Sequence, residues 1–384
     1  MSVPKLRFDG FSGNWVTTQL GNICSFTQGV QIPQSEQINE ERDGYIRYLY
    51  IRDFFSDKFK CYVPNIYPEK IIHPHEIMMV NTGNTTGEAY TRRYGVLSNN
   101  SFKIDYDLAH FNDQFMYLFC SSELAQNQIK KFFNAGGQPH LGHKNISQIL
   151  ISYPKKEEQT KIASFLSAVD EKISQLTQKH ELLSQYKQGM MQKLFSQQLR
   201  FKADDGSEFG EWEKTTLGKV VNFQNGKRVP LSESDRQKRQ GEYRYYGASG
   251  VIDHIDDYIF DGQYILIGED GANIITRSSP LAFIVEGQFW VNNHAHIFQS
   301  KNGSNVFLAA YLESLNYEKF NSGTAQPKLN LDNLKKVPVI NPCLDEQTKI
   351  ANFLSAIDQK IEVVAQQIEQ AKTWKKGLLQ QMFV

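Results

Sequence analysis

The sequence predicts an α+β (mixed) protein in which two globular, β-rich domains are joined by two long antiparallel coiled-coil helices, with pseudo-two-fold symmetry. First, residues 158–173 return as residues 346–361 with only three of sixteen positions changed. Second, apolar residues in both copies alternate at spacings of four and three, which places one narrow apolar seam along a helix. Third, the segments between the copies are less alike and contain short β-like runs broken by Gly, Pro and Asn.

The bulk composition is that of an ordinary soluble protein. Of the 384 residues, 22% are charged and 40% are apolar, which suits two or three domains. The formal net charge is zero, so any basic face that binds nucleic acid must be local. The four cysteines are scattered and no apolar run has the length of a signal peptide or membrane span. These features predict a cytoplasmic protein with no membrane partner.

Repeated motifs also flank the helices and set the expected domain boundaries. Residues 6–8 recur as 199–201, Trp15 recurs as Trp212, and the Gln-Pro-x-Leu segment 138–141 recurs as 326–329. The chain therefore begins where a preceding helix would have ended, as if a closed ring of two units had been cut once, and its termini should lie close together. We expect a first globular domain over 1–154, a central spacer helix over 155–198, a second globular domain over 199–342 and a C-terminal spacer helix over 343–384.

Finer features follow from local patterns. Short helices are expected near residues 111–119 and 306–315 inside the two globular domains. Lys187 and Lys375 interrupt the helical seam at equivalent positions, and the adjacent Tyr186 and Trp374 predict that the seam drifts toward them. Each long helix, of about 39 residues, should be roughly 58 Å long.

The paired motifs resemble the specificity subunit of type I restriction–modification systems over essentially the whole chain. The resemblance rests on two Glu-Gln-x-x-Ile-Ala-x-Phe-Leu-Ser-Ala-x-Asp helices, two Trp-x4-Leu-Gly lead-ins and two Gly/Ala-Gln-Pro-x-Leu segments. It implies that each globular domain is a target recognition domain that reads half of a split site in double-stranded DNA. The two domains differ in length and sequence, so the site should be asymmetric. The helices would act as a spacer between the half-sites.

The same resemblance implies a non-catalytic subunit that binds no cofactor itself. Its partners would be two modification subunits, which methylate adenine with S-adenosylmethionine, and two restriction subunits, which use ATP; Mg is expected in the partner subunits as well. The sequence contains no Asn/Asp-Pro-Pro-Tyr methyltransferase motif, no phosphate-binding loop and no Pro-Asp dipeptide. Three alternatives stay open: a specificity module of another bifunctional restriction–modification class, a coiled-coil adaptor that binds proteins, and a cryptic nuclease.

Candidate DNA contacts lie in polar, glycine-containing loops and basic clusters. Asn, Thr and Arg side chains can bond base edges or phosphates, although the same loops read equally well as solvated turns, and the basic clusters as solvated surface. The candidates in the first domain are Asn81, Thr82, Asn84, Thr85, Thr86, Arg92, Arg93, Gln138, His140 and Lys144. Those in the second domain are Lys227, Arg228, Asn273, Arg277, Gln326 and Lys328. For the repeated Gln-Pro-x-Leu loops, a structural turn is the favoured interpretation.

A second set of candidates concerns protein partners. Phe165, Met191, Phe353 and Leu379 fall off the helical seam. A bare two-helix coiled coil would leave them exposed, which predicts that a helical partner packs there.

Overall fold

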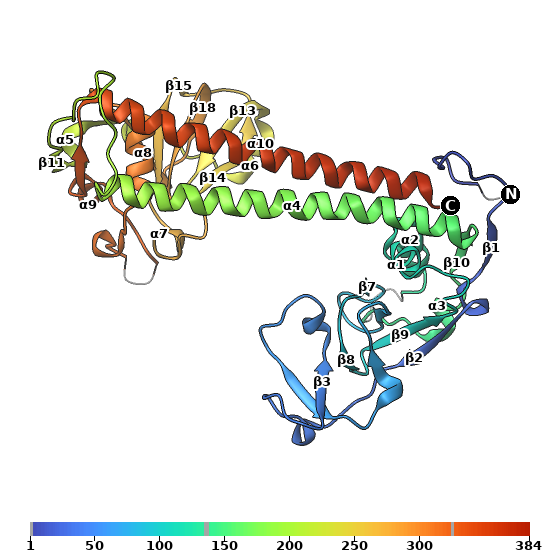
Figure 1. Ribbon diagram of the computed structural model, residues 1–384. Coiled ribbons are helices and arrows are strands. Elements are labelled where there is room, and N and C mark those ends of the chain that lie inside the picture. Colours follow the sequence, from blue (N-terminus) through green and yellow to red (C-terminus); the bar gives the residue numbers. More distant parts are fainter. Residues whose placement is uncertain (1–2, 134–137, 324–325) are drawn as a thin grey trace. The chain divides into compact units, whose positions relative to one another are not determined.

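The computed structural model describes residues 3–133, 138–323 and 326–384, which form two compact units. The first unit contains residues 1–177 and 366–384, and the second contains residues 178–365. Two long helices, α4 (Lys156–Phe195) and α10 (Leu344–Met382), each contribute one part to each unit (Figure 1). The predicted fold class is confirmed: both units are β-rich and are connected by these helices.

The described residues of the first domain form two four-stranded sheets, one two-stranded sheet and three short α-helices. One sheet has the strand order β2-β9-β6-β7, the other has the order β4-β3-β8-β5, and β1 pairs separately with β10. The strands are β1 (Val16–Gln19), β2 (Cys24–Gln28), β3 (Tyr45–Leu49), β4 (Cys61–Pro64), β5 (Ile71–Ile72), β6 (Ile77–Val80), β7 (Ala89–Tyr90), β8 (Gly95–Leu97), β9 (Ser101–Tyr106) and β10 (Leu150–Tyr153). The helices are α1 (Asp113–Ser121), α2 (Glu123–Lys130) and α3 (His143–Ile146).

The second domain repeats this topology strand for strand. Its sheets have the orders β12-β19-β16-β17 and β14-β13-β18-β15, and β11 pairs with β20. The strands are β11 (Glu213–Thr216), β12 (Val221–Phe223), β13 (Gln240–Gly247), β14 (Gly250–Ile255), β15 (Phe260–Asp261), β16 (Tyr264–Gly268), β17 (Ala282–Val285), β18 (Gln288–Val291), β19 (Ala295–Ser300) and β20 (Pro338–Asn341). The helices are α5 (Leu217–Val220), α6 (Glu233–Lys238), α7 (Asn273–Thr276), α8 (Asn305–Glu313) and α9 (Leu331–Lys335).

The domain cores explain why the central strands β6 and β16 are apolar on both faces. Every residue of β6 is fully buried, because one face packs toward the helices and the other toward the second sheet. Its counterpart β16 is buried in the same way from Ile265 onward, whereas Tyr264 is half-buried. The two short helices expected from the sequence are confirmed as α1 and α8, and each starts at a side-chain cap, Asn112 or Ser304.

Within each unit, parts of α4 and α10 that are far apart in the sequence share one core. In the first unit, Ile162 and Leu166 near the start of α4 share a cluster with Leu378 and Met382 at the end of α10. The second unit combines the end of α4 with the start of α10 in the same antiparallel sense. Leu6 N–H donates to the Gln381 carbonyl (3.0 Å), so the prediction that the termini lie close together is confirmed.

The repeated Glu-Gln pair at the start of each long helix fastens the helix to its domain. Arg7 forms a bidentate ion pair with the buried Glu158 (2.7 and 2.8 Å). Arg200 pairs with Glu346 in the same way (3.0 and 2.7 Å). The following glutamine accepts a backbone N–H at the start of a domain helix, since Gln159 Oε1 bonds Asn112 N (3.0 Å). Its counterpart bonds Ser304 N (2.9 Å).

The expected drift of the helical seam is wrong. Lys187 forms an ion pair with Asp358, and Lys375 forms the equivalent pair with Asp170 (2.6 Å), so both lysines keep their side chains toward the neighbouring helix. Tyr186 and Trp374 keep 52% and 54% of their surfaces exposed, and the Trp374 ring packs edge-on against Phe165 of α4 (6.0 Å). A lysine stem can cover apolar surface while its ammonium reaches a carboxylate, so the seam tolerates the charge without rotating.

Candidate nucleic-acid interface

In both domains the repeated Gln-Pro-x-Leu segment pairs with the loop that follows the central buried strand. In the first domain, Leu141 N–H donates to the Asn81 carbonyl (2.8 Å) and Gly83 N–H to the Pro139 carbonyl (3.3 Å). In the second, Leu329 donates to Glu269 (2.7 Å) and Gly271 to Pro327 (3.0 Å). Isolated bridges join Thr82 to His140 and Asp270 to Lys328. The loops at 81–87 and 269–273 are therefore structurally equivalent.

Each loop turns at a glycine that adopts a left-handed conformation. Gly83 has φ +119° and Gly271 has φ +106°, a backbone region that side chains disfavour. The repeated segment thus holds a fixed turn in both domains, while the residues around that turn differ. This arrangement keeps the backbone constant and varies the chemistry that is presented.

In the first loop only part of the predicted set reaches the surface. Thr86 is buried and its hydroxyl donates to the carbonyls of Gly83 and Pro139, so it stabilises the turn. The Asn81 side chain is also buried. Asn84 is exposed, Thr85 is half-buried, and Thr82 bonds the exposed His140 through its hydroxyl (2.9 Å). The surface of this loop therefore consists of neutral polar groups and one imidazole.

The remaining candidates of the first domain divide between surface and interior contacts. Arg92 is exposed and has φ +63°, whereas Arg93 donates to the Phe54 carbonyl (3.0 Å) and faces Asp57. Gln138 and Lys144 are exposed. Arg92 is thus available for a ligand, and Arg93 mainly holds the chain around Phe54.

The second loop carries acids that are already paired. Glu269 accepts from Arg228 (2.8 Å) and lies 3.7 Å from the Lys328 ammonium. Asp270 lies 2.9 Å from the His294 ring. Arg228 also donates to the Ala295 carbonyl (2.7 Å), so its guanidinium is used inside the domain, while Lys227, Gln326 and Lys328 are exposed.

His296 lies directly beneath the second loop. It is fully buried; its Nε2 bonds the Leu329 carbonyl (2.6 Å) and its Nδ1 lies 2.8 Å from the Asn225 amide. These partners fit a neutral ring that donates through Nε2. Burial lowers the pKa of His296 from its usual value because the charged form loses its hydration.

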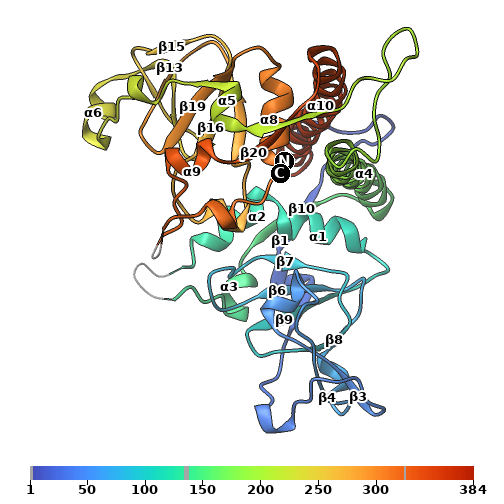
Figure 2. The same ribbon diagram turned by 90° about the vertical axis from the view of Figure 1, so that its left-hand side faces the viewer.

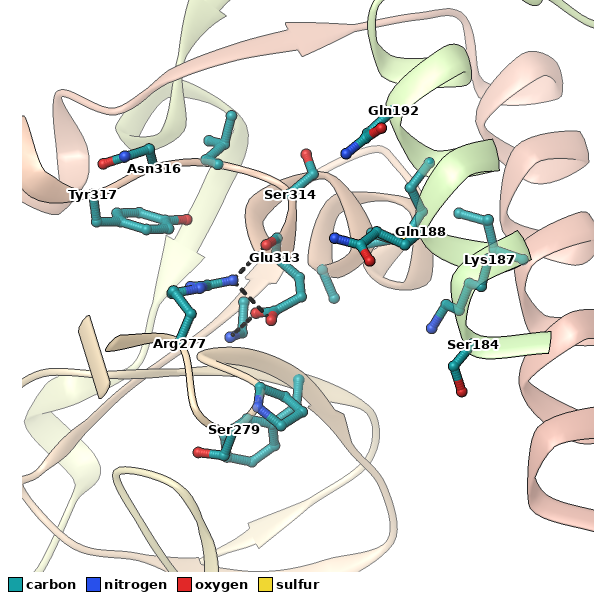
Figure 3. A pocket seen from close by; sticks show the side chains of 18 of the residues that line it. Ser184, Lys187, Gln188, Gln192, Arg277, Ser279, Glu313, Ser314, Asn316 and Tyr317 are labelled. Atoms are coloured by element: carbon teal, nitrogen blue, oxygen red, sulfur yellow. Dashed lines mark hydrogen bonds and ion pairs between the residues drawn. The ribbon is translucent and has the colours of Figure 1, made fainter. Parts of the chain in front are cut away.

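Arg277 and Asn273 contribute to internal structure instead of the loop surface. Arg277 pairs with Glu313 of α8 (2.7 Å) and lies over the Tyr317 ring, in the wall of a cavity of about 1280 Å³ that Gln188 of α4 also lines (Figure 3). Asn273 Oδ1 accepts from the backbone N–H of Ser279 (2.9 Å). Glu313 also accepts hydrogen bonds from the backbone N–H groups of Leu281 and of Ala282, the first residue of β17, so this network stabilises the domain.

The four off-seam residues have partners within the chain and are half-buried. Phe165 packs edge-on against Phe8 (5.5 Å), and Phe353 against Phe201 (5.5 Å). Met191 and Leu379 join the clusters at the two ends of the helices. The lead-in segments thus cover much of the surface that a bare coiled coil would expose. Tyr186 and Trp374 offer larger exposed aromatic surfaces, although the Trp374 ring also contacts Phe165.

Within the described ranges, His, Cys, Asp and Glu form no group of three or more that could hold a metal ion. No helix in the same residues is long and apolar enough to cross a membrane.

Comparison with known proteins agrees with this architecture. The chain is 28% identical over 406 aligned positions to the type I restriction enzyme MjaVIII specificity subunit of Methanocaldococcus jannaschii, covering 95% of this chain and 91% of that protein. A putative type I restriction enzyme specificity subunit of Haemophilus influenzae is 36% identical over 154 residues, covering 40% of this chain and 38% of its own.

The fold is also similar to a crystal structure of the type I restriction–modification system S subunit from M. genitalium. The TM-score is 0.64 at 17% identity, covering 100% of this chain and 99% of the other. Residues 12–185 and 210–373, one match for each unit of the internal repeat, fit the family described as "Type I restriction modification DNA specificity domain". The chain belongs to this family of type I restriction–modification specificity proteins.

Proposed function

We propose that this chain reads an asymmetric, two-part site in double-stranded DNA, with one half-site for each domain. The supporting observation is that two copies of one fold hold structurally equivalent loops of different chemistry. The first loop offers Asn84, Thr85 and His140, which are neutral or titratable polar groups. The second offers Lys328 beside paired carboxylates. Unlike donor and acceptor sets at equivalent positions select unlike base pairs.

The chain contributes binding and positioning in this proposal, and its partners contribute catalysis. Methyl transfer from S-adenosylmethionine would take place in modification subunits, and ATP-dependent translocation and cleavage, with Mg, in restriction subunits. The chain itself would bind none of these cofactors. Paired loop acids support this division, because Glu269 and Asp270 are engaged with Arg228 and His294.

The two long helices supply equivalent docking positions for two modification subunits. Tyr186 and Trp374 occupy the same position in the two copies of the repeat, and each exposes about half of its surface. Exposed Tyr and Trp residues are typical anchors of protein interfaces, since they combine a large apolar ring with a polar tip. Two equal positions support a stoichiometry of two, and the restriction subunits would join through the assembled complex.

Methylation mapping tests the proposal directly. The chain is expressed in a methylation-deficient host together with the adenine methyltransferase encoded beside it, and methylated adenines are mapped across the genome. The expected result is one split motif with two different halves around a spacer of fixed length. A continuous palindrome, or the absence of any motif while both proteins are present and folded, would contradict the proposal.

A further inference from the structure

The connection between β3 and β4 in the first domain differs from the equivalent connection between β13 and β14 in the second. Residues 50–60 join β3 to β4 in the first domain, whereas only Ala248 and Ser249 separate β13 from β14 in the second. The connections start at the same place in the fold, because Ser98 N–H donates to Leu49 and Asn292 N–H donates to Tyr246, each at 3.0 Å. The longer connection is therefore an addition specific to the first domain.

The start of this connection is anchored firmly. Phe54 is buried in the core between the two sheets, with 5% of its surface exposed. Asp53 accepts from the Tyr50 backbone N–H (2.9 Å), and Arg93 donates to the Phe54 carbonyl (3.0 Å). The neighbouring Phe55 remains exposed although the residues before it are held in place.

The outer surface of the connection combines aromatic rings with cations. Phe55 and Phe59 are each 61% exposed. Arg52, Lys58 and Lys60 are exposed, and across the described part of the chain no carboxylate forms an ion pair with them.

The nearby acids do not cancel this positive charge. Asp53 and Asp57 both pair with Arg47, and Asp57 also faces Arg93. The hydrogen bond from Arg47 lowers the pKa of Asp57. Both acids already have cationic partners, which leaves the outer lysines and Arg52 to act on a ligand.

This surface is continuous with the recognition loop of the same domain. The Phe55 ring lies 6.3 Å from that of Tyr90, whose hydroxyl bonds Glu88, and Glu88 N–H donates to the Thr85 carbonyl (3.0 Å). The strands β3 and β4 that carry the connection lie at the end of the first domain remote from α1 and α2 (Figure 2). A ligand on the loop at 81–87 can thus extend onto residues 50–60.

We propose that residues 50–60 form a second DNA-contacting segment of the first domain, in which Arg52, Lys58 and Lys60 contact phosphates and Phe55 and Phe59 make apolar contacts with bases. Duplex DNA fits this surface because it presents a dense row of negative charge beside apolar base edges and faces. The inference rests on the proposed function and assigns the first half-site a larger footprint than the second.

In the full-length protein, phenylalanine and lysine substitutions separate the apolar base contacts from the phosphate contacts. The probe is a duplex that carries the methylated motif found by mapping. Phe55→Ala and Phe59→Ala are each expected to raise Kd on the order of tenfold without changing its salt dependence, since apolar base contacts release no counterions. Lys58→Ala and Lys60→Ala are each expected to reduce the slope of log K against log salt concentration by about 1. Val363→Ala and Lys179→Ala, exposed residues on the long helices, serve as controls and should change neither quantity.

The second measurement uses a duplex with a scrambled first half-site. On this duplex, the phenylalanine variants and the wild-type protein should have the same Kd. Binding of wild-type protein with no change in Kd or slope for any of the four variants would overturn the inference and leave the proposed function intact. Failure of the wild-type protein to bind any duplex would instead refute the proposed function. Unfolding midpoints equal to wild type confirm that the exposed substitutions leave the fold unchanged.

Discussion

At the scale of single residues, the buried Glu346 connects the start of α10 to the segment that leads into the second domain. It accepts two bonds from Arg200 and one from the Trp212 indole (2.7 Å). Glu346→Gln keeps the shape but removes the charge and one acceptor, which leaves buried donors poorly satisfied. We expect the free energy of unfolding to fall by about 1–3 kcal/mol, measured by urea denaturation.

The equivalent residue of the first unit gives a built-in comparison. Glu158 pairs with Arg7, but the Trp15 indole N–H has no partner among the described residues. Glu158→Gln should therefore cost less than Glu346→Gln. Asp345→Asn, on an exposed residue beside Glu346, should be close to neutral. Equal losses at 158 and 346 would contradict the role assigned to the Trp212 bond.

His296 predicts a pH dependence in the second domain. Because burial lowers its pKa, both folded and unfolded chains hold a neutral ring above the unfolded pKa of about 6.5. As the pH falls below that value, the unfolded chain binds a proton first, so stability decreases, by at most about 1.4 kcal/mol per pH unit. His296→Phe, which introduces the residue type found at the equivalent Phe102, should show a smaller loss between pH 7 and pH 5 in urea denaturation. His254→Ala, on an exposed ring, should retain the wild-type slope.

The sequence aligned the polar loops of the two units but could not assign the role of each side chain. The repeated Gln-Pro-x-Leu segment and the polar loop could be aligned between units, and the backbone bonds confirm that alignment. The roles of Arg228 and Arg277 depend on Glu269 and Glu313, which lie far along the chain and meet them only through strand pairing and helix packing. Residues 50–60 carried a signal, adjacent aromatic and basic residues, that spacing alone could not distinguish from a solvated turn.

At the scale of secondary-structure elements, the long helices were predicted well because a four-three apolar pattern acts over many turns. Hydrophobicity alone does not determine which residues occupy the seam near Tyr186 and Trp374. The Lys187–Asp358 and Lys375–Asp170 pairs provide a polar alternative at the same positions. The aromatic residues could therefore remain outside, where they become candidate anchors for partners.

The helices lead to a prediction about partner stoichiometry. Trp374→Ala and Tyr186→Ala each remove one exposed aromatic anchor, and loss of such an anchor typically weakens an interface by about 2 kcal/mol or more. Native mass spectrometry of the complex with the modification subunit should show two bound copies for wild type and predominantly one for each single variant. The double variant should lose both copies at the same protein concentration.

Leu182→Ala supplies the matched control for this experiment. Leu182 is as exposed as the two aromatics, but the repeat places Gln370 at its equivalent position, so it marks no symmetric site. It should retain two copies. Retention of two modification subunits by the double variant would show that docking occurs elsewhere on the chain.

At the scale of the whole molecule, the internal repeat defines two interchangeable domains in a common frame. Leu20 N–H donates to the Ile149 carbonyl (2.8 Å), and Leu217 N–H donates to the Val337 carbonyl (2.9 Å). An equivalent backbone hydrogen bond therefore joins the start and the end of each domain. The segments 21–148 and 218–336 lie between these junctions. The repeat made this division visible in the sequence, whereas the bases read depend on the residues that do not repeat.

These junctions allow a decisive exchange. Replacing residues 218–336 with a copy of residues 21–148 keeps both frame bonds and places the same reading surface in both units. Because each half-site is read by its own domain and the two units are related by pseudo-two-fold symmetry, methylation mapping should show the first half of the wild-type motif retained and the second half replaced by an inverted copy of the first. The unexchanged protein, mapped in the same host, identifies the two original halves. A motif that keeps its second half after the exchange would mean that the frame, and not the inserted domain, carries the sequence preference.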